Sequence, residues 1–600
     1  MKTLHTIRLI IIVLMGMHAG CGQEAAPPSS SPAGLVVRYS TLSSKIRGLD
    51  PMDIGDTTSS AIGGNIFDCL YQYHYLKRPY QLIPNLAATM PTVSEDGLTY
   101  TIPIRDDVVF FDDECFKATS GKGRTLTAAD FIYAWKRIAN IKNVSKNWWI
   151  FDGRIVGFDE FREYTKTIKD KANVDYSKPV KGLVALNDHL LQIKLKKPWP
   201  QMQFMLAHLP TAPVPHEAVN HYGEEILNHP VGTGPFILED WKRGSKIILS
   251  RNPTFRDDRY PSEGEPGDKE AGLLEDAGKR LPLIDRAEFL VIQEDQPRWL
   301  KFMAGDLDVA GIPKDSFDKV INTNRQLTPE MLAKGIILTK YQTPLTLWYG
   351  INMEDPILGT NLPLRRAMNL ALNRKEYIQL FANNRAIPAR GILPAMFGDF
   401  NPGLVSPYIN YDPKKAKQLL AEAQRIHGGP LPTIVMTMGG TDSTARQIGQ
   451  YLTRAYKAVG LDFQVEYMDW PTSQDKVKNK NAQVYAMGWY ADYPDSENFM
   501  LLFYGPNGSP GPNNMNYKNA EFDELFEKMG TMASSPERKA LVQKMEQMVI
   551  EDLPCILTSH PIAFTLHYNW ALNRKPHVFG EGHLKYGNID VERRRKAKTG

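Results

Sequence analysis

The sequence predicts an α/β protein in which strands and helices alternate along one long chain. Three observations favour this class: short runs alternate apolar and polar residues as half-buried strands do, longer runs repeat apolar residues at helical spacing, and the two kinds of run are interleaved. The chain has 600 residues, of which 42% are hydrophobic and 23% charged. This is the composition of a water-soluble globular protein with substantial cores.

Two segments carry the clearest strand signal. Residues 98–104 read LTYTIPI and residues 191–195 read LQIKL, so that every second residue is apolar in both. Such alternation is typical of strands with one buried and one solvated face.

Three helices are predicted from their first residues. Thr127 and Asp130 form a capping pair, while Asp412–Pro413 and Ser535–Pro536 each place a proline in a first helical turn. We expect the apolar residues that follow at helical spacing to lie in the core: Phe131, Ala134, Trp135 and Ile138; Ala416, Leu419, Leu420 and Ala423; Leu541, Met545, Met548 and Val549.

Clear linkers are absent between Gly34 and the basic C-terminal tail. The only long polar interruption is Asp257–Gly278, which is predicted to be a surface insertion. A chain of this length without linkers is expected to build its domains by crossing back and forth between lobes.

The first 20 residues are predicted to be an export signal. Lys2 and Arg8 precede the apolar run Leu9–Met17, which as a helix rises only ~14 Å, about half of a bilayer core. Ala19–Gly20 then leads into Cys21, in a pattern that resembles a lipoprotein processing site. We therefore expect a lipid anchor on Cys21, with cleavage and plain secretion as the alternative.

Residues 21–34 are rich in Pro and Ser, and we expect them to form a flexible tether.

Charge and cysteine usage exclude two classes of function. The formal net charge is +4, but seven basic residues lie in the export signal or the C-terminal tail, so that the folded body is nearly neutral and no nucleic-acid partner is expected. Besides Cys21, the cysteines Cys69, Cys115 and Cys555 show no C-x-x-C spacing, which argues against a zinc site. A Cys69–Cys115 disulfide is left open by the sequence.

Residues 486–499, AMGWYADYPDSENF, are the most informative segment of the chain. They set Asp492 among three aromatic rings at the end of an apolar run, and an ionised carboxylate in a cleft accepts hydrogen bonds from a cationic amine. The segment resembles the ligand-contacting segment of the oligopeptide-binding proteins that serve bacterial ABC importers. In that family an aspartate preceded by Gly-Trp-x-x pairs with the α-ammonium of a bound peptide, and Asp492 is the matching position.

The resemblance to this family, the bacterial extracellular solute-binding proteins of family 5, extends over nearly the whole exported chain. It is carried in order by short motifs: Leu49–Pro51, Asp96–Tyr100 with Arg105, Leu126–Phe131, Asn187–His189, Pro213–Pro215, Gly232–Phe236, Arg251–Phe255, Ala371–Arg374 and Trp489–Phe499. It implies a two-lobe periplasmic-binding-protein-like fold (type II, large peptide-binding group) with an extra inserted subdomain and an interlobe ligand cleft. The implied boundaries are 35–67, 190–344 and 560–600 for lobe I, 68–189 for the inserted subdomain and 345–559 for lobe II.

The resemblance also implies which residues contact the ligand. Asp492 would bind the peptide amine, Trp489 and Trp470 would form walls of the cleft, and Asp495 would cap the segment that follows it. The peptide main chain would bind as an added strand to two segments. These segments are Gly488, Trp489 and Tyr490, and the loop of Gly55, Asp56, Thr57 and Thr58. Relatives that hold the carboxylate of a short peptide carry an arginine six residues before the aspartate, where this chain has Ala486.

Enzyme motifs are not indicated. His216 and His221 flank a brief zinc-peptidase-like pattern, but they stand five residues apart and would lie about 140° apart around a helix. Neither a nucleophile elbow nor a Walker-type phosphate loop is present, and no cofactor is expected. Five histidines fall between His189 and His229, and we interpret them as exposed loop residues, with nickel or copper binding as the alternative.

These observations predict an exported, non-enzymatic, monomeric receptor. It would capture oligopeptides between two lobes and deliver them to an ABC permease and its ATPase subunits, closing over the ligand by a population shift. The alternatives are a receptor for a nickel chelate or a saccharide, a peptidase, and a sensory binding protein.

Overall fold

The structure is a computed structural model that describes residues 34–41, 46 and 48–599. Residues 1–34 and 35–600 form two separate units, and every element below belongs to the second. The predicted export signal, Cys21 and the tether up to residue 33 lie outside the described residues. None of the helices in the described part of the chain combines the length and apolarity that crossing a membrane requires.

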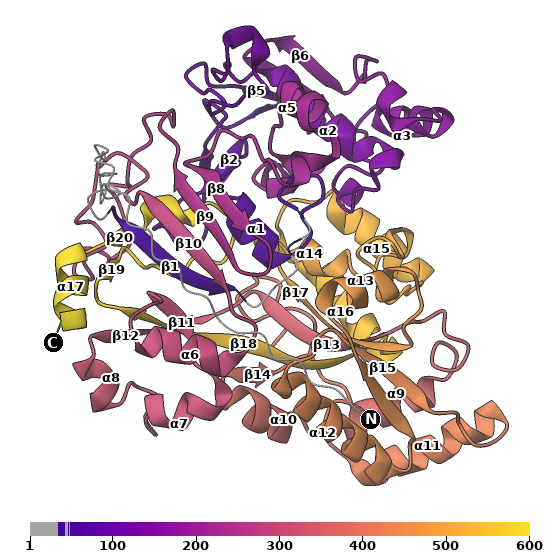
Figure 1. Cartoon of the computed structure of the whole chain (residues 1–600). Coiled ribbons are helices and arrows are strands. Elements are labelled where there is room, and N and C mark those ends of the chain that lie inside the picture. Colours follow the sequence, from indigo (N-terminus) through magenta and orange to yellow (C-terminus); the bar gives the residue numbers. More distant parts are fainter. Residues whose placement is uncertain (1–33, 42–45, 47, 600) are drawn as a thin grey trace, which may run out of the picture. The chain divides into compact units, whose positions relative to one another are not determined.

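The first sheet joins the start of the folded chain to strands more than 200 residues later (Figure 1). Its strand order is β1-β10-β9-β8, with β1 parallel to β10 and the other pairs antiparallel. The strands are β1 (Val36–Thr41), β8 (Phe236–Lys242), β9 (Lys246–Arg251) and β10 (Arg286–Val291). The core of the unit is therefore assembled from distant segments, as expected for a chain that crosses back and forth.

A second sheet, with order β4-β5-β7-β6, contains both strands predicted from alternation. Its members are β4 (Thr92–Val93), β5 (Thr99–Pro103), β6 (Leu183–Asn187) and β7 (Leu190–Lys194). Tyr100, Ile102, Leu191 and Ile193 are buried, so the predicted apolar face is confirmed.

Helices lie near this sheet, and one of them begins at a predicted capping residue. They are α2 (Ala128–Ala139), α3 (Phe158–Thr167) and α5 (His216–Tyr222). Thr127 and Asp130 form the predicted capping box of α2. The predicted stripe of α2 is buried, which makes its aromatic rings core residues.

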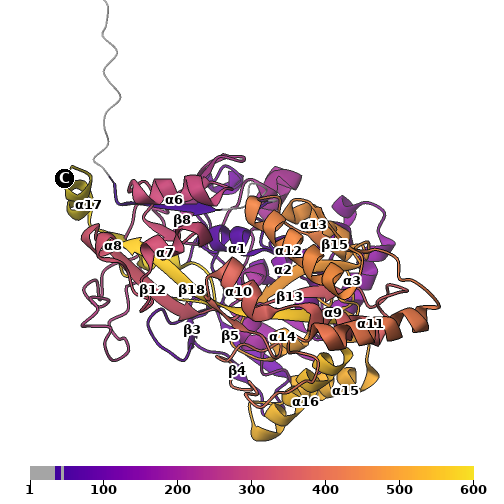
Figure 2. The ribbon, with the colours of Figure 1, turned by 90° about the horizontal axis from the view of Figure 1, so that it is seen from below.

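The largest sheet has the order β11-β18-β13-β17-β15-β16, with β12 and β14 also paired to β18. The strands are β11 (Val309–Gly311), β12 (Ile336–Gln342), β13 (Leu345–Ile351), β14 (Ala386–Pro388), β15 (Ile434–Met438), β16 (Phe463–Tyr467), β17 (Val484–Tyr490) and β18 (Cys555–Tyr568). The 14-residue β18 pairs with β13 through its first half and with β12 through its second, and β12 and β13 lie at opposite ends of it (Figure 2).

Helices pack around this sheet. They are α9 (Leu362–Ala371), α10 (Arg374–Ala382), α11 (Pro413–His427), α12 (Ser443–Val459), α13 (Trp470–Lys478), α14 (Glu497–Met500), α15 (Ala520–Gly530) and α16 (Pro536–Asp552). The predicted starts of α11 and α16 are confirmed, because Asp412 and Ser535 are their N-caps, and α11 ends at Gly428 as a left-handed C-cap.

The remaining elements are short or lie near the chain ends. They are β2 (Tyr71–Tyr73), β3 (Leu82–Pro84), β19 (Ala571–Leu572), β20 (Asn588–Ile589), α1 (Thr57–Gly63), α4 (Met202–Met205), α6 (Asp295–Met303), α7 (Phe317–Val320), α8 (Pro329–Ala333) and α17 (Val591–Thr599).

The stretch Asp257–Gly278, predicted to be a surface insertion, contains no helix or strand, and it is anchored to the body. Asp268 is buried, and Nζ of Lys575 lies 2.8 Å from both Glu265 Oε2 and Asp268 Oδ2. The insertion is therefore fixed against the C-terminal segment of the chain.

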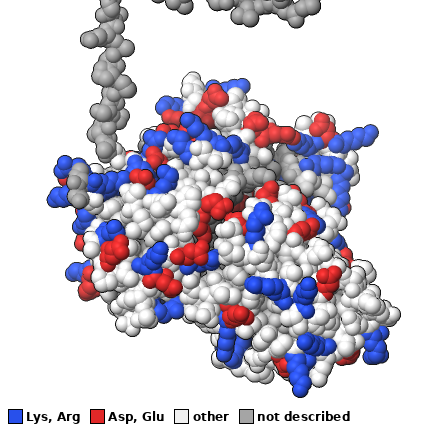
Figure 3. Space-filling model, turned by 60° about the horizontal axis from the view of Figure 1, so that its bottom comes forward, with Lys and Arg blue, Asp and Glu red and all other residues white. Residues whose placement is uncertain are grey.

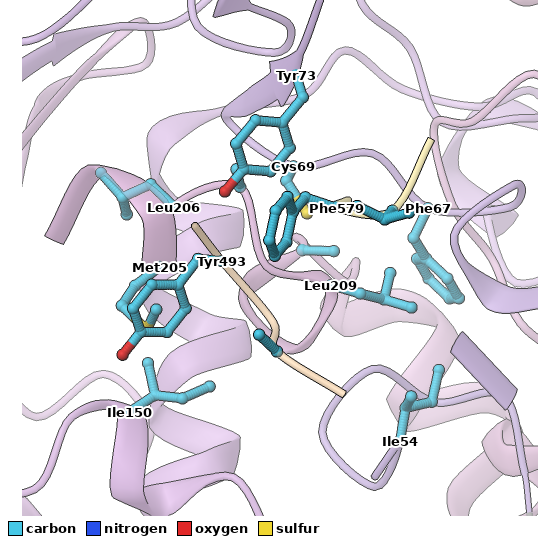
Figure 4. Close-up of a cluster of buried hydrophobic side chains, with 14 of the residues drawn as sticks. Ile54, Phe67, Cys69, Tyr73, Ile150, Met205, Leu206, Leu209, Tyr493 and Phe579 are labelled. Carbon is cyan, nitrogen blue, oxygen red and sulfur yellow. The ribbon is translucent and has the colours of Figure 1, made fainter. Parts of the chain in front are cut away.

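The three cysteines in the described part of the chain are buried free thiols, so the Cys69–Cys115 disulfide that the sequence left open does not form. Figure 4 shows Cys69 within a cluster of buried side chains that stretches in sequence from Ile54 to Phe579. Burial in this apolar cluster raises the pKa of the Cys69 thiol, so it is an unreactive core residue.

Charged residues of both signs are interspersed over the face of the molecule that Figure 3 shows. This distribution is consistent with the nearly neutral folded body that the sequence indicates.

Candidate functional site

Asp492 lies two residues beyond the end of β17, and Asn498 holds its carboxylate. Nδ2 of Asn498 donates to Asp492 Oδ2 at 3.0 Å, and Oδ1 of Asn498 accepts from the Asp492 backbone N–H at 2.9 Å. Asn498 is fully buried in α14, whereas the side chain of Asp492 is 22% exposed. The carboxylate is therefore fixed in orientation and still open to a ligand.

Trp489 is positioned by the same amide. Its Nε1–H donates to Oδ1 of Asn498 at 2.8 Å. One buried side chain thus sets both the predicted carboxylate and the predicted aromatic wall. Sequence reasoning gave Asn498 no role, because a short polar residue after a turn gives no local sign of what it will contact.

No lysine or arginine in the described part of the chain forms an ion pair with Asp492. The nearest basic group is His208, whose Nε2 lies 4.0 Å from Asp492 Oδ1. Burial lowers the pKa of His208 despite the opposing effect of Asp492, so this imidazole is neutral at pH 7. Asp492 therefore lacks a cationic partner within the part of the chain that the structure describes.

Glu581 is a second carboxyl group in the same region, and sequence reasoning missed it. It lies against the end of α1, since a Cβ built on Gly64 would fall 2.1 Å from the Glu581 Cβ. Part of the residue is exposed to solvent, while desolvation of the carboxyl group, together with the charge of Asp492, raises its pKa to about 8. Gly580 and Gly582, both at positive φ, flank it in a turn, which is the only sequence signal it carries.

The segment Gly488–Tyr490 lies in β17, and one of its edges is free of strand partners. It pairs antiparallel with β13, with Tyr490 opposite Leu345, whereas β15 pairs with β17 only at Val484 and Tyr485. Within the described strands, residues 486–490 therefore keep an edge that an extended guest can occupy.

Gly488 and Tyr490 serve this strand differently. A Cβ on Gly488 would lie 2.6 Å from Cδ2 of Leu347, so glycine allows β13 to approach closely. Burial raises the pKa of Tyr490 well above its ordinary value, with Tyr341, Tyr80 and Glu581 adding to the effect. Tyr490 therefore links the end of β17 to the surroundings of Glu581.

The expectation of a strand-like segment at Gly55–Thr58 is wrong, because this segment begins a helix. Asp56 is the N-cap of α1, and its Oδ1 accepts from the backbone N–H groups of Thr58 at 3.1 Å and Ser59 at 3.0 Å. These donors are satisfied within the chain and are not available to a guest strand. Gly55 precedes the cap, and a Cβ built on it would make only an ordinary contact with Lys146.

Thr57 and Thr58 nevertheless line a cavity of about 600 Å³. It is bounded by β1, β12, β18, the first turns of α1 and the C-terminal segment 574–587. Its polar and aromatic lining includes Tyr39, Asn65, Tyr75, Arg298, Tyr341, His567, Arg574, Lys575, His577, Glu581 and His583. The volume lies within the range of about 300–1,000 Å³ that is typical of small-molecule sites.

Trp470 is the first residue of α13 and does not line this cavity. Its ring packs over Gly439, where an added Cβ would lie 2.7 Å away. Since β15, β16 and β17 run parallel, Trp470 and Asp492 share the carboxyl edge of these strands.

Asp495 accepts from the backbone N–H of Glu497 at 2.8 Å, as the capping prediction requires, and also pairs with Arg538.

The histidines between 189 and 229 do not form a metal centre. The described part of the chain contains no group of three or more side chains that could hold a metal ion. His216 lies 3.2 Å from Glu217 and His221 lies 3.3 Å from Glu114, so the two histidines of the zinc-peptidase-like pattern contact different residues.

Comparisons with known proteins agree with this architecture. The chain is 25% identical over 517 residues to the oligopeptide-binding protein OppA of Bacillus subtilis, covering 84% of each chain. It is also 25% identical over 519 residues to the glutathione-binding protein GsiB of Escherichia coli O1:K1 / APEC, covering 85% of this chain and 86% of the relative.

A solved structure of the periplasmic binding protein DppA from Helicobacter pylori, in complex with the peptide STSA, superposes with a TM-score of 0.72. It is 21% identical and covers 92% of this chain and 97% of its own. The predicted periplasmic-binding-protein-like α/β fold is thereby confirmed.

The model of bacterial extracellular solute-binding proteins, family 5 Middle, matches residues 81–511, which is well over half of the chain. The chain therefore belongs to the bacterial extracellular solute-binding proteins of family 5.

Proposed function

We propose that this protein is the substrate-binding component of an ABC importer and captures oligopeptides for a membrane permease and its ATPase subunits. The observation that carries the proposal is the carboxylate of Asp492, which Asn498 holds beside Trp489 without a cationic partner in the described part of the chain. A peptide α-ammonium supplies the missing charge through charge-assisted hydrogen bonds of about 1.5–3 kcal/mol each.

The open edge of β17 supports an extended ligand. A peptide main chain laid along residues 486–490 would hydrogen-bond as an added strand, and these bonds do not depend on the peptide sequence. The likeness to proteins named for oligopeptides and for glutathione, itself a tripeptide, supports peptides of varied length as the ligand class.

The division into lobes follows from the same proposal. Lobe I would comprise 35–67, 190–344 and 560–600, with the inserted subdomain at 68–189 and lobe II at 345–559. The chain would cross between the lobes where β12 leads into β13 and where β18 runs back, so hinge closure would turn about these strands. The protein binds and releases its ligand without catalysis in this proposal, and it works as a monomer.

Anchoring completes the proposed role. The protein would be exported and held at a membrane by a lipid on Cys21, with residues 21–34 as the tether. Intact-mass measurement of the membrane-extracted protein tests this, since a diacylated Cys21 adds the mass of its lipid and cleavage elsewhere does not.

The decisive experiment offers the purified protein a mixed library of tripeptides to hexapeptides and identifies the retained peptides by native mass spectrometry. Asp492→Asn should weaken the best peptide by about 10-fold or more, because it keeps the shape of the side chain and removes its charge. Asp106→Ala, at an exposed loop carboxylate, is the matched control and should bind normally.

Retention of a metal chelate or a sugar in place of any peptide would refute the peptide assignment. New amine termini appearing in the library would identify a peptidase. Peptide affinity that Asp492→Asn leaves unchanged would remove Asp492 from the site.

A further inference from the structure

Arg574 lines the 600 Å³ cavity, and no acidic side chain in the described part of the chain forms an ion pair with it. Its Nε and Nη2 are buried and have no hydrogen-bond partner in the described part of the chain, and it takes part in no ion pair there. The guanidinium carbon lies 5.1 Å from the ring centroid of Tyr39. Tyr39 hydrogen-bonds part of the guanidinium, but two of its buried donors remain without an acceptor, which is unfavourable, so this position is poised for an acceptor from outside the chain.

The carboxylate that raises the pKa of Arg574 is already engaged. Asp308, which acts on Arg574 electrostatically, is paired with Arg594 and accepts the Nε1–H of Trp570 at 2.8 Å. Lys575, the next residue along the chain, is paired with Glu265 and Asp268. The described part of the chain therefore offers Arg574 no counter-ion.

The other basic groups that line the cavity do not compete for an anion. Arg298 is paired with Asp295. Burial lowers the pKa of His567 and His583 to about 4 each, and lowers the pKa of His577 well below its ordinary value. These imidazoles are neutral at pH 7, so Arg574 is the available positive charge among the residues that line the cavity.

The cavity lining also includes an acidic residue, Glu581. Glu581 interacts electrostatically with Asp492 and Tyr490, so in the proposed function it lies on the side of the ligand amine. The C-terminal segment thus contributes an acidic group at 581 and a basic group at 574. A ligand with one cationic and one anionic end matches this arrangement, whereas a neutral sugar or a dication does not.

We propose that Arg574 binds the terminal carboxylate of the captured peptide. It would take the role of the arginine that relatives carry at the position of Ala486. This inference rests on the proposed function and names the residue that holds the far end of the ligand. A planar guanidinium accepts a carboxylate through two parallel hydrogen bonds, which gives the site a preference for free-acid peptides.

The test compares the peptide recovered from the library with its own C-terminal amide, by calorimetry on the full-length protein. The wild-type protein should bind the free acid about 10-fold or more tightly than the amide. Arg574→Gln should lower the affinity for the free acid to that for the amide and leave the affinity for the amide unchanged. Arg280→Gln, at an exposed arginine outside the cavity, is the matched control.

Folding of the variant is checked by its thermal midpoint without peptide. It should stay the same or rise, since the substitution removes an uncompensated buried charge. If Arg574→Gln does not fold, Arg574→Lys replaces it and should retain part of the preference for the free acid, because the charge remains without the planar fork.

Equal affinity of the wild-type protein for acid and amide, or a preference for the acid that survives in Arg574→Gln, overturns the role of Arg574 and leaves the peptide function standing. If the protein binds neither form and no peptide of the library, the proposed function and this inference are both overturned.

Discussion

At the scale of single residues, Asn498 and Glu581 decide how the site presents negative charge. The side-chain amide of Asn498 hydrogen-bonds both Asp492 and Trp489, so the carboxylate of Asp492 is oriented before a ligand binds. Glu581 adds a carboxyl group whose proton is held by its surroundings and by the charge of Asp492. In the proposed site, the two residues would give the end that binds the amine both a fixed geometry and a response to pH.

Ligand binding should release protons at pH 7. The pKa of Glu581 is raised to about 8, so the group is mainly protonated in the free protein at pH 7. An ammonium bound nearby favours the ionised form and lowers that pKa, so affinity should rise with pH up to about 8. Above this, the peptide amine loses its own proton, at a pKa of about 7.7–8.0.

Calorimetry in two buffers with different ionisation enthalpies measures this release. Glu581→Gln should abolish it, and a binding enthalpy that does not depend on the buffer in the wild-type protein would exclude the mechanism. The other groups that interact with Glu581 are Asp492, Tyr490 and Cys69, and the latter two are neutral at this pH because burial raises their pKa values.

Glu546 should make the fold less stable as pH rises. It is 1% exposed, its Oε1 accepts from the Leu393 N–H at 3.0 Å, and burial raises its pKa from 4.5 to about 7. The native state therefore holds a proton that the unfolded chain loses above pH 4.5, and stability falls between pH 4.5 and 7. Glu546→Gln should be more stable than wild type at pH 8, by roughly 1–3 kcal/mol, and similar at pH 5.

Urea unfolding at the two pH values tests this prediction. Glu537→Gln, at an exposed glutamate of the same helix, is the control and should leave the pH dependence intact. The prediction would be contradicted if the free energies of unfolding of wild type and Glu546→Gln differed by the same amount at both pH values.

At the scale of elements, local signals in the sequence were reliable and distant contacts were not. The caps Thr127, Asp412 and Ser535 begin helices as predicted, because a cap acts within four residues of itself. Asp492 was proposed from the resemblance of residues 486–499 to the family, and its contact with Asn498 is also local in the sequence. Glu581 and Arg574 reach the site only after β18 has brought the C-terminal segment back beside α1, and no local pattern encodes that return.

The loop at Gly55–Thr58 shows the opposite failure. The resemblance to the family suggested an extended segment there, whereas the Asp56 side chain satisfies the first N–H groups of α1 and fixes a helical turn. Thr57 and Thr58 line the cavity while Gly55 and Asp56 do not, and the backbone of the segment is helical from Thr57 onward.

Asp56→Ala should therefore reduce stability more than binding. Loss of the N-cap costs about 1 kcal/mol, and peptide affinity should stay within about 3-fold of wild type because the Asp56 carboxylate is used by the helix. Asp442→Ala removes the N-cap of α12 and serves as the matched control for stability. A large loss of affinity with unchanged unfolding would assign Asp56 to the ligand after all.

At the scale of the whole molecule, one buried ion pair joins the proposed inserted subdomain to the proposed lobe II. Arg154 Nη2 lies 3.1 Å from Glu497 Oε1, and the guanidinium stacks 3.8 Å from the ring centroid of Trp199. Glu497 is 1% exposed and immediately precedes Asn498. The segment that orients Asp492 is thus tied directly to a region more than 300 residues earlier.

Arg154→Ala should destabilise the protein, because it leaves the Glu497 carboxyl buried without its partner. A double-mutant cycle with Glu497→Gln should give a coupling free energy of about 1–3 kcal/mol, reduced from that of a fully buried pair because Arg154 is 26% exposed. The exposed pair Lys197–Glu527, with N and O 3.4 Å apart, is the control and should give less than about 1 kcal/mol. Equal coupling in the two cycles, measured by urea unfolding, would contradict this difference.

The position of β18 in the chain has a consequence for biogenesis. This strand pairs with β11, β12, β13 and β14, yet it is synthesised after all four of them. Until residues 555–568 leave the ribosome, the central sheet lacks the strand that bridges its two ends, so a nascent chain keeps an incomplete core for most of its synthesis. Such late completion would suit the export proposed above, because the sheet can close only after the last of its strands has been made.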